Sequence, residues 1–428
     1  MSCERQTNKH TVRSSVLGTS SKSAMAYLVY FATAVVAILI SARILSVLLR
    51  VKRTIPFKRL QLSKLQKLNE KGGENNALVI GGQGLLGKKL VQSLVKDGSY
   101  TIHSLDLYIP SESSRLQGVA SYIQTDITNE KDVLKALEGM DSVFLTASLQ
   151  PSVKFSNNQM RRVNIDGTRN VVNACKAQGV KRLIYTSSIS VTMSKFPDKP
   201  DDLIQESDPF PEIPLNAYVE SKGKAELMVR EADGSGQLNT IALRLAGLLG
   251  GKSNQVSKSF CKPIVAYVGD GNFKIDYVHI DSAVEAHVLA EKKLNNEQKK
   301  GGGVQRIHEN GVTSGTHKNG HVKINTISGK VYMITMREKC SQKELMEHVS
   351  KIRGLPRPFG IPLSLLFPIT RLNRWLYVVT GLAILPMCTM QVEFMRAFNA
   401  LPDLANKELG WVDETSWREI VGKAIHEY

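Results

Sequence analysis

Short apolar runs and segments of helical period alternate along residues 77–191. The first run is ALVI at Ala77–Ile80, and leucines at near-helical spacing follow it. Further apolar runs of strand length are TIHSLDLY, YIQTDI, DSVFLTAS and RLIYTSSISV, at 101–108, 122–127, 141–148 and 182–191. Strands that alternate with helices in this way predict an α/β fold with a doubly wound parallel sheet.

An uncharged stretch of 19 residues precedes this region, from Ala24 to Ala42. As a helix it would measure about 29 Å, close to the thickness of a bilayer's hydrocarbon core. Arg43 lies near one end, where an arginine can reach the interface, so the span can extend to Leu49. We predict an uncleaved transmembrane signal anchor at 24–49. The alternatives are a buried core helix and a cleaved signal or transit peptide.

The formal net charge of +17 raises the question of nucleic-acid binding. Residues 1–76 carry 13 Lys and Arg against 3 Asp and Glu, and 299–330 carry 6 against 1, whereas 77–298 carry 25 of each. A neutral central block argues against a nucleic-acid partner. Six positive residues, Arg43 among them, closely follow the uncharged stretch Ala24–Ala42 and four precede it, which favours a cytosolic catalytic domain.

A glycine-rich turn directly follows the first predicted strand. Gly81, Gly84 and Gly87 permit a tight turn into a helix and close approach of the backbone to a pyrophosphate. Asp106 lies 19 residues after Gly87, where a carboxylate accepts hydrogen bonds from the adenosine ribose. A carboxylate there repels a 2′-phosphate, so NAD is favoured over NADP. The pattern predicts a Rossmann-type dinucleotide site.

Other predicted cofactor contacts lie in this turn and at the ends of the following strands. Asp126 ends the run YIQTDI, where its side chain and backbone can bond adenine, and Ala147 ends a strand that passes under the cofactor. The complete predicted cofactor set is Gly81, Gln83, Gly84, Leu85, Leu86, Gly87, Asp106, Asp126, Ile127, Ala147, Tyr218 and Lys222.

A serine, a tyrosine and a lysine are spaced for alcohol oxidation. Ser188 ends a predicted strand, and Tyr218 and Lys222 follow at i and i+4, on one face of a predicted helix. A free phenol has a pKa of about 10, too high for a base at neutral pH, but a nearby ammonium favours the phenolate. Tyr218 would take the hydroxyl proton, Lys222 would also hold the nicotinamide ribose, and Ser188 would orient the substrate oxygen. A solvated helix face is the alternative, because Tyr-x-x-x-Lys alone occurs by chance.

The motifs GGQGLLG, VNIDGTRNVVNAC, YTSSISV and YVESK resemble the extended short-chain dehydrogenase/reductase superfamily. Within it the chain resembles the 3β-hydroxysteroid dehydrogenase family, closest to its sterol-4α-carboxylate 3-dehydrogenase (decarboxylating) type, on Val79–Gly82 and the C-terminal stretch TMQVEFMRAFNALPDLANKELGW. The resemblance covers about 77–298 and 331–428. It implies that Ser188, Tyr218 and Lys222 are catalytic, with Ser187 the fallback serine. It also implies that Asn164, near the site, belongs to the catalytic set, and it places Phe273–Asp281 in a motif that helps close the site.

Two segments depart from that family pattern. Arg244-Leu245 stands where the family has Arg-Pro, and LLGGK follows in place of Tyr-Gly or Gly-Pro. Residues 299–330 are rich in Gly, Asn, His and Lys and are predicted to be a disordered insertion. His308, His317 and His321 lie there at irregular spacing, so we predict no metal site.

The five cysteines show no CxxC pair and indicate neither a disulfide framework nor a zinc site.

We expect six parts along the chain. They are a polar tail at 1–23, the anchor at 24–49, a basic linker at 50–76, a Rossmann-type catalytic domain at 77–298, the insertion at 299–330 and a smaller, membrane-associated substrate-binding part at 331–428. The last part is apolar from Gly354 to Met390. A helix lying in the membrane interface, a second span and a plain domain core are the alternatives there.

The resemblance implies NAD-dependent oxidation of the 3β-hydroxyl of a 4α-carboxysterol with loss of CO₂. The alternatives are a 3β-hydroxysteroid dehydrogenase/Δ5-isomerase, a dihydroflavonol-reductase-like enzyme using NADPH, and a cofactor-binding membrane scaffold or redox sensor without turnover. The expected partners are a sterol or steroid substrate and membrane lipid, with other sterol C4-demethylation enzymes and a second copy of the chain as further candidates. We expect the endoplasmic reticulum membrane as the location, with a plastid or other organelle membrane as the alternative.

Overall fold

The computed structural model describes residues 75–194, 204–251, 254–263, 265–300, 326–385, 387–394 and 400–426. The chain divides into two compact units. The described residues of the larger unit lie within 75–369 and 387–426, and those of the smaller unit are 370–385.

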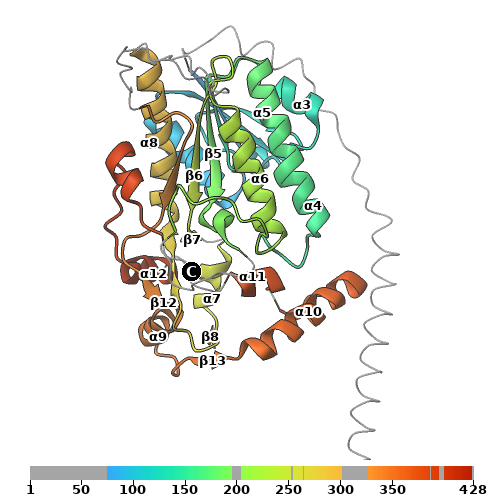
Figure 1. Ribbon diagram of the computed structural model, residues 1–428, viewed down its shortest axis with the longest axis vertical. Helices are drawn as coiled ribbons and strands as arrows, with labels where there is room; N and C mark the ends of the chain where they lie inside the picture. The colour runs from blue at the N-terminus through green and yellow to red at the C-terminus, as the bar shows by residue number, and fades with distance from the viewer. Residues whose placement is uncertain are drawn as a thin grey trace, which may run out of the picture. The chain divides into compact units, whose positions relative to one another are not determined.

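A seven-stranded, wholly parallel sheet forms the centre of the larger unit (Figure 1). Its strands lie in the order β11–β6–β5–β4–β1–β2–β3. Their bounds are β1 (Asn76–Ile80), β2 (Thr101–Asp106), β3 (Val119–Gln124), β4 (Ser142–Leu145), β5 (Arg182–Ser188), β6 (Asn239–Leu245) and β11 (Lys330–Ile334). The chain order reverses between β1 and β4, and in open α/β sheets a ligand crevice lies at such a reversal. The predicted α/β, Rossmann-type fold is confirmed.

Helices cover both faces of this sheet (Figure 1). On one face α2 packs against α8, and on the other α5 packs between α3 and α6. The bounds are α2 (Leu85–Asp97), α3 (Glu130–Ala136), α5 (Thr168–Ala177), α6 (Ala217–Glu231) and α8 (Ile280–Lys299). Strand β1 shows the cause: Ala77 and Val79 point into one core, and Leu78 and Ile80 into the other. A strand buried on both faces therefore appears in the sequence as an unbroken apolar run.

Several short helical segments lie between these strands and helices along the chain. They are η3 (Glu112–Ser114), α4 (Asn157–Arg161), the π-helical turn η4 (Arg162–Gly167), η5 (Ile189–Thr192) and the π-helical turn η6 (Ala405–Leu409). Single π-helical turns occur frequently at functional sites, and η4 carries Asn164.

A smaller region beyond the carboxyl ends of the sheet has its own core, which includes Phe260, Leu345 and Trp417. Its strand pairs are β7 (Gly247–Leu249) with β10 (Tyr277–His279), β8 (Ala266–Val268) with β13 (Phe359–Ile361), and β9 (Lys274–Ile275) with β12 (Cys340–Ser341). Its helices include α7 (Gln255–Phe260), α9 (Gln342–Arg353), α11 (Thr389–Glu393) and α12 (Trp417–His426), and α10 (Leu363–Thr380) precedes α11.

The boundary predicted after residue 330 differs from the structure. Strand β11 pairs in parallel with β6, so the segment that begins at Lys330 completes the central sheet. Val331, Tyr332, Met333 and Ile334 are all buried, which explains why this strand joins the core of the sheet. The first and last residues of the predicted insertion at 299–330 lie in described elements, Lys299 in α8 and Lys330 in β11. Residues 301–325 lie outside the described residues, so the insertion stays a prediction there.

The predicted tail, anchor and almost all of the linker also lie outside the described residues, which begin at 75. Among the helices that the structure describes, including α10 and α11, none is both long enough and apolar enough to cross a bilayer. The anchor at 24–49 therefore stays a prediction.

A buried ion pair fastens α6 to the sheet. Arg244 on β6 and Glu226 on α6 are both fully buried, with Nη2 and Oε1 2.8 Å apart and Nε donating to Oε2 at 3.0 Å. Ser187 on β5 donates to the same carboxylate at 2.5 Å. Such a pair adds little net stability, but removal of one partner leaves a buried charge without compensation.

We therefore expect Arg244→Met to lower the free energy of unfolding by about 3–5 kcal/mol. Chemical denaturation of the purified full chain would measure this loss. The matched control is Arg230→Met, because Arg230 lies 4.0 Å from the same carboxylate but is 41% exposed and should change stability little. Equal losses in the two variants would contradict the prediction.

Candidate functional site

The turn from β1 into α2 has the shape of a dinucleotide cradle. The N–H groups of Gly81 and Gly82 donate to the Leu105 carbonyl oxygen at 2.8 and 3.1 Å, which joins the turn to the end of β2. Gly84 caps α2 without a side-chain hydrogen bond, so the helix presents backbone N–H groups to an anion. A Cβ atom at Gly87 would lie 2.1 Å from the Gly81 carbonyl oxygen, so only glycine fits there. These residues fit a bound pyrophosphate.

Of the predicted adenosine contacts, Asp106 lies at this turn, and Asp126 and Ile127 follow β3. The Asp106 carboxylate accepts the backbone N–H of Gln83 at 2.9 Å, so the acid lies beside the glycine turn. Asp126 accepts the Thr128 N–H at 2.9 Å, two residues beyond the end of β3. Ile127 is buried and lies so close to Gly167 that a Cβ there would come within 2.6 Å of its side chain.

Ala147 and the first residues of α2 lie at the same turn. The Ala147 N–H donates to the Ile80 carbonyl at 3.0 Å, and a Cβ on Gly81 would lie 2.7 Å from the Ala147 nitrogen. Leu86 is buried in the core, whereas Leu85 is only partly buried and lies against Gly251. The structure thus brings the predicted cofactor residues of β1, α2, β2 and β4 to one edge of the sheet.

Helix α6 positions Tyr218 and Lys222. The Asn216 side chain caps this helix by accepting the N–H groups of Tyr218 and Val219 at 3.1 and 3.2 Å. Tyr218 is 6% exposed and Lys222 2%, because the helix presses this face onto β5. The Lys222 ammonium donates to the Thr186 carbonyl at 2.5 Å and lies 4.3 Å from the centre of the Tyr185 ring.

Burial decides the electrostatics of this pair. It lowers the pKa of Lys222 to about 7, and the Glu226 charge opposes that shift. Burial likewise raises the pKa of the Tyr218 phenol, while hydrogen bonds with Gln150 and Ser188 oppose it. Because burial disfavours the charged form of Lys222, the other partners of the phenol gain importance.

The two candidate serines of β5 have different surroundings. The Ser187 hydroxyl donates to buried Glu226 at 2.5 Å. The Ser188 hydroxyl lies beside the Tyr218 phenol and 2.8 Å from the Ser190 hydroxyl. Since side chains alternate along a strand, Ser188 faces the tyrosine, whereas Ser187 points into the core toward Glu226.

Asn164 joins two parts of the site through its side-chain amide. It accepts the Leu149 N–H at 2.7 Å and donates to the Leu149 carbonyl and to the Ser221 hydroxyl, each at 3.1 Å. Asn164 is only 1% exposed. Asn164 therefore connects the loop after β4 to α6 and holds these two parts of the site in place.

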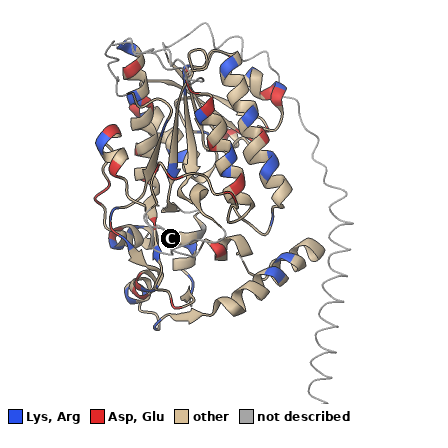
Figure 2. Cartoon of the chain, in the orientation of Figure 1, with Lys and Arg blue, Asp and Glu red and all other residues tan. Residues whose placement is uncertain are grey.

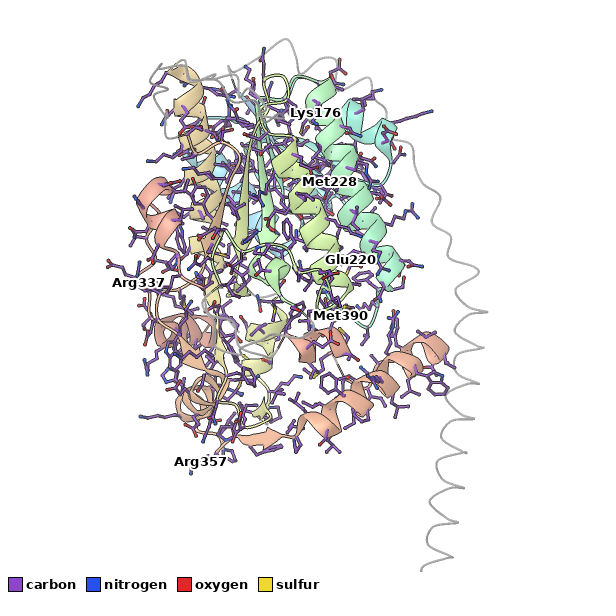
Figure 3. The ribbon with its side chains drawn as sticks, viewed as in Figure 1. Lys176, Glu220, Met228, Arg337, Arg357 and Met390 are labelled. Carbon is purple, nitrogen blue, oxygen red and sulfur yellow. The ribbon has the colours of Figure 1, made fainter. Side chains whose placement is uncertain are left out.

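Sequence reasoning missed two residues that contact Tyr218. Gln150 follows β4, and its side chain opposes the rise in the pKa of Tyr218; its place just beyond a central strand was the available signal. Phe394 lies edge-on to the Tyr218 ring at 5.7 Å between centroids. Phe394 follows α11, and Glu393 of that helix accepts a hydrogen bond from the Asn216 side chain at 3.0 Å. The first turn of α6 therefore lies against α11; Figure 3 labels Glu220 on the former and Met390 on the latter.

Arg244, which the family pattern keeps before the departing Leu245, has a structural role. Its guanidinium pairs with Glu226 and lies 5.8 Å from the centre of the Phe210 ring, on the core side of β6. The residue is thus part of the support for α6. The motif Phe273–Asp281 forms β9, β10 and the start of α8 in the larger unit.

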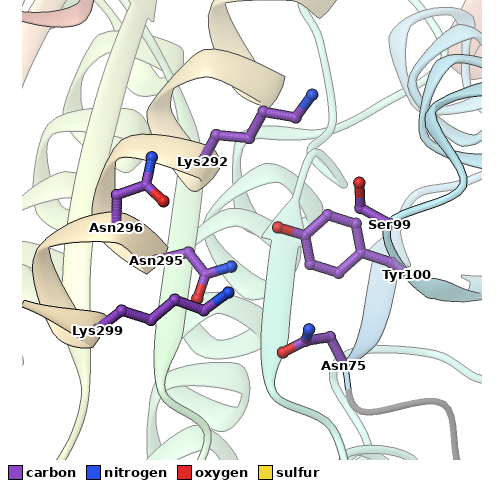
Figure 4. Close-up of a pocket in the computed structure, with 7 residues that line it drawn as sticks. All are labelled: Asn75, Ser99, Tyr100, Lys292, Asn295, Asn296 and Lys299. Atoms are coloured by element: carbon purple, nitrogen blue, oxygen red, sulfur yellow. The ribbon is translucent and has the colours of Figure 1, made fainter.

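A polar pocket of about 370 Å³ lies at the opposite, amino-terminal edge of the strands (Figure 4). Its lining includes Asn75, Tyr100 and Lys292, and no predicted site residue contributes to it. Within the described ranges no group of His, Cys, Asp and Glu is arranged to hold a metal ion; His308, His317 and His321 lie outside them.

Solved structures share this fold at low sequence identity. The UDP-glucose 4-epimerase of Thermotoga maritima aligns with a TM-score of 0.59 and 19% identity, over 82% of this chain and 97% of the epimerase. The UDP-glucuronic acid 4-epimerase of Bacillus cereus, solved with NAD, aligns with a TM-score of 0.59 and 20% identity over 82% and 98%. At these identities the likeness establishes the fold alone.

Curated relatives are more similar in sequence. The 3beta-hydroxysteroid-dehydrogenase/decarboxylase isoform 1 of Arabidopsis thaliana is 29% identical over 72% of this chain and 68% of its own length. For isoform 2 the alignment spans only 53% of the relative. The decarboxylating sterol-4-alpha-carboxylate 3-dehydrogenase of Mus musculus is 30% identical over 57% of this chain and 67% of its own length.

The model of one protein family matches most of the described chain. It is the 3-beta hydroxysteroid dehydrogenase/isomerase family, and the match runs over residues 78–365. This range contains the glycine turn, Ser188, Tyr218 and Lys222, which confirms the family expected from the sequence motifs. The chain therefore belongs to the 3-beta hydroxysteroid dehydrogenase/isomerase family and is an oxidoreductase.

Proposed function

We propose that this chain oxidises the 3β-hydroxyl of a 4α-carboxysterol with NAD and that the product loses CO₂. The observation that carries the proposal is the buried Tyr218–Lys222 pair beside Ser188, at the same edge of the sheet as the dinucleotide cradle. The printed names of the Arabidopsis and mouse relatives support this substrate class.

The residues of this chain have distinct roles in that reaction. Tyr218 takes the proton of the substrate hydroxyl, and Ser188 donates a hydrogen bond to the same oxygen and orients it. Lys222 favours the phenolate and holds the nicotinamide ribose. A nicotinamide held by Lys222 and the glycine turn would supply the acceptor for the hydride from C3. The dehydrogenation thus yields a ketone, a reduced cofactor and one proton.

Loss of CO₂ then follows from the chemistry of the product. The new ketone lies β to the 4α-carboxylate, so the electrons of the breaking C–C bond move into the carbonyl and form an enolate. Ser188 and the protonated Tyr218 are placed to hydrogen-bond that oxygen. Protonation of the enolate at C4 completes the step, so no separate decarboxylating residue is required.

The proposal includes NAD as the preferred cofactor. Asp106 lies beside the glycine turn and accepts the Gln83 N–H, which leaves a carboxylate where the adenosine ribose is expected. A 2′-phosphate at that place would meet a negative charge.

The proposal also includes attachment to the endoplasmic reticulum membrane through residues 24–49, with the catalytic part in the cytosol. Helix α10 supports a lipid-facing role for the C-terminal part, because it contains no Asp or Glu (Figure 2) and exposes large apolar side chains. Those more than half exposed are Leu365, Leu372, Trp375 and Val378. An exposed apolar surface on a helix is typical of segments that lie in the membrane interface.

The first test incubates the detergent-solubilised full chain with a 4α-carboxysterol and NAD. We expect NADH and CO₂ in equal amounts, and Tyr218→Phe should lower the rate by about 10²–10⁴-fold while NAD binding is retained, because only the base is lost. Tyr122→Phe is the matched control with unchanged turnover, since that phenol bonds the Leu116 N–H away from β5. Absence of both products would overturn the substrate, and full activity of Tyr218→Phe would overturn the mechanism.

The cofactor preference provides a second test. We expect a higher kcat/KM with NAD than with NADP, and Asp106→Ser should narrow that ratio at least tenfold by removing the charge that repels the 2′-phosphate. Asp132→Ser on the exposed surface of α3 is the control. If the NAD-to-NADP ratio of kcat/KM is unchanged in Asp106→Ser, another residue selects between the two cofactors and the prediction is wrong.

Membrane attachment is tested by alkaline carbonate extraction of cells expressing the full chain. The chain should remain in the membrane pellet, and removal of 24–49 should release a large part of it, because the apolar span holds it irreversibly. Complete extraction of the intact chain would contradict the anchor.

A further inference from the structure

We propose that Glu393 is a positioning residue for Tyr218: from the C-terminal segment it fixes the side chain that caps α6, and thereby the place of the phenol in the site. This role rests on the proposed function, in which Tyr218 is the base. Two contacts of α11 and the residue after it with the start of α6 support it, one polar and one aromatic.

The polar contact passes through the side-chain amide of Asn216. Its Oδ1 accepts the N–H groups of Tyr218 and Val219 at 3.1 and 3.2 Å, and its Nδ2 donates to the Glu393 carboxylate at 3.0 Å. Because the two helix N–H groups are donors and the carboxylate is an acceptor, only one orientation of the amide satisfies all three partners. Glu393 therefore fixes the group to which the backbone N–H of Tyr218 is bonded.

The aromatic contact lies one residue further along the chain. The rings of Phe394 and Tyr218 meet edge-on, with their centroids 5.7 Å apart and their planes at 82°. Aromatic pairs prefer this arrangement to a direct face-to-face stack, so the contact favours one orientation of the phenol. Phe394 also packs against the hydrophobic core that includes Leu245 and Ala246, and its own ring is held in place there.

Helix α11 is itself anchored in the smaller region. Val392 is fully buried and belongs to an apolar cluster with Val268 on β8 and Leu366 on α10. Consecutive residues of α11 thus reach different neighbours, Val392 this cluster and Glu393 the cap of α6. The helix connects the C-terminal part, where we expect the sterol to bind, to the helix that carries the base.

The exact place of Tyr218 matters for the proposed proton transfer. A base must come within hydrogen-bond distance of the substrate hydroxyl, and a displacement of about 1 Å can lower a rate about 10²-fold. Lys222 and Glu226 fix the middle of α6 through their bonds to β5 and β6. Glu393 acts at the start of the helix, and a hydrogen bond to a charged carboxylate is stronger than one between neutral groups.

The test compares Glu393→Leu, which removes the acceptor, with Glu393→Gln, whose amide oxygen can still accept from Asn216. In the purified full chain labelled with 3-fluorotyrosine, Tyr218→Phe identifies the fluorine resonance of Tyr218, and no substrate is needed. We expect that resonance to shift or broaden in Glu393→Leu and to stay at the wild-type position in Glu393→Gln. A merely structural role would reduce the amount of folded chain without moving the resonance of the folded fraction.

The kinetic measurement uses the 4α-carboxysterol and NAD. The kcat per NAD-binding site should fall about tenfold in Glu393→Leu with little change in KM, because binding is retained and only the base is displaced. Glu393→Gln should keep most of the wild-type kcat. Glu338→Leu is the matched control, since Glu338 also lies in the C-terminal part and accepts a side-chain hydrogen bond, from Arg418 at 2.9 Å.

The outcomes separate the two proposals. If thermal melting shows that Glu393→Leu does not fold, Asn216→Ser replaces it, because serine also caps a helix but is too short to reach Glu393. An unchanged Tyr218 resonance, an unchanged kcat, or an equal change in Glu393→Gln overturns the positioning role. Failure of the wild type to oxidise the sterol overturns the proposed function alone, since the resonance still decides whether Glu393 positions Tyr218.

Discussion

The buried carboxylate of Glu226 is the interaction on which the rest of the site depends. It receives the Arg244 guanidinium from β6 and the Ser187 hydroxyl from β5, so it fixes α6 against two neighbouring strands. One turn earlier on the same helix, Lys222 reaches the Thr186 carbonyl, and another turn earlier stands Tyr218. Because all three side chains share one helix face, the ion pair in the core sets the depth and rotation of the phenol at the edge of the sheet.

The same burial creates the chemical difficulty of the site. Desolvation disfavours both the phenolate and the ammonium, so the groups that would perform the chemistry are each driven toward their neutral forms. Hydrogen bonds with Ser188 and Gln150 oppose this on the tyrosine side, and the Glu226 charge opposes it on the lysine side. The site thus combines a dry environment, which strengthens polar interactions, with fixed donors that are already oriented.

Parallel strands bring the two halves of the site together. The glycine turn after β1, Asp106 at the end of β2, Ala147 after β4 and Ser188 at the end of β5 are distant in the sequence, but the carboxyl ends of parallel strands share one edge. Asn164 adds a connection across this edge between the loop after β4 and α6. The C-terminal segment contributes from outside the sheet, through the contact of Phe394 with Tyr218 and of Glu393 with Asn216.

The sequence by itself determined the fold class, the glycine turn with its acid and the spacing of Tyr218 and Lys222, because these are local patterns of apolar period, glycine and helical repeat. Only the tertiary structure distinguished Ser188 from Ser187, since both are hydroxyls on one strand and differ in which side of the sheet they face. It alone also placed β11 in the sheet, beyond the predicted insertion, and brought Gln150 and Phe394 to the phenol. Contacts between residues so far apart in the chain have no periodic signature; they depend on strand order and on the burial of α6.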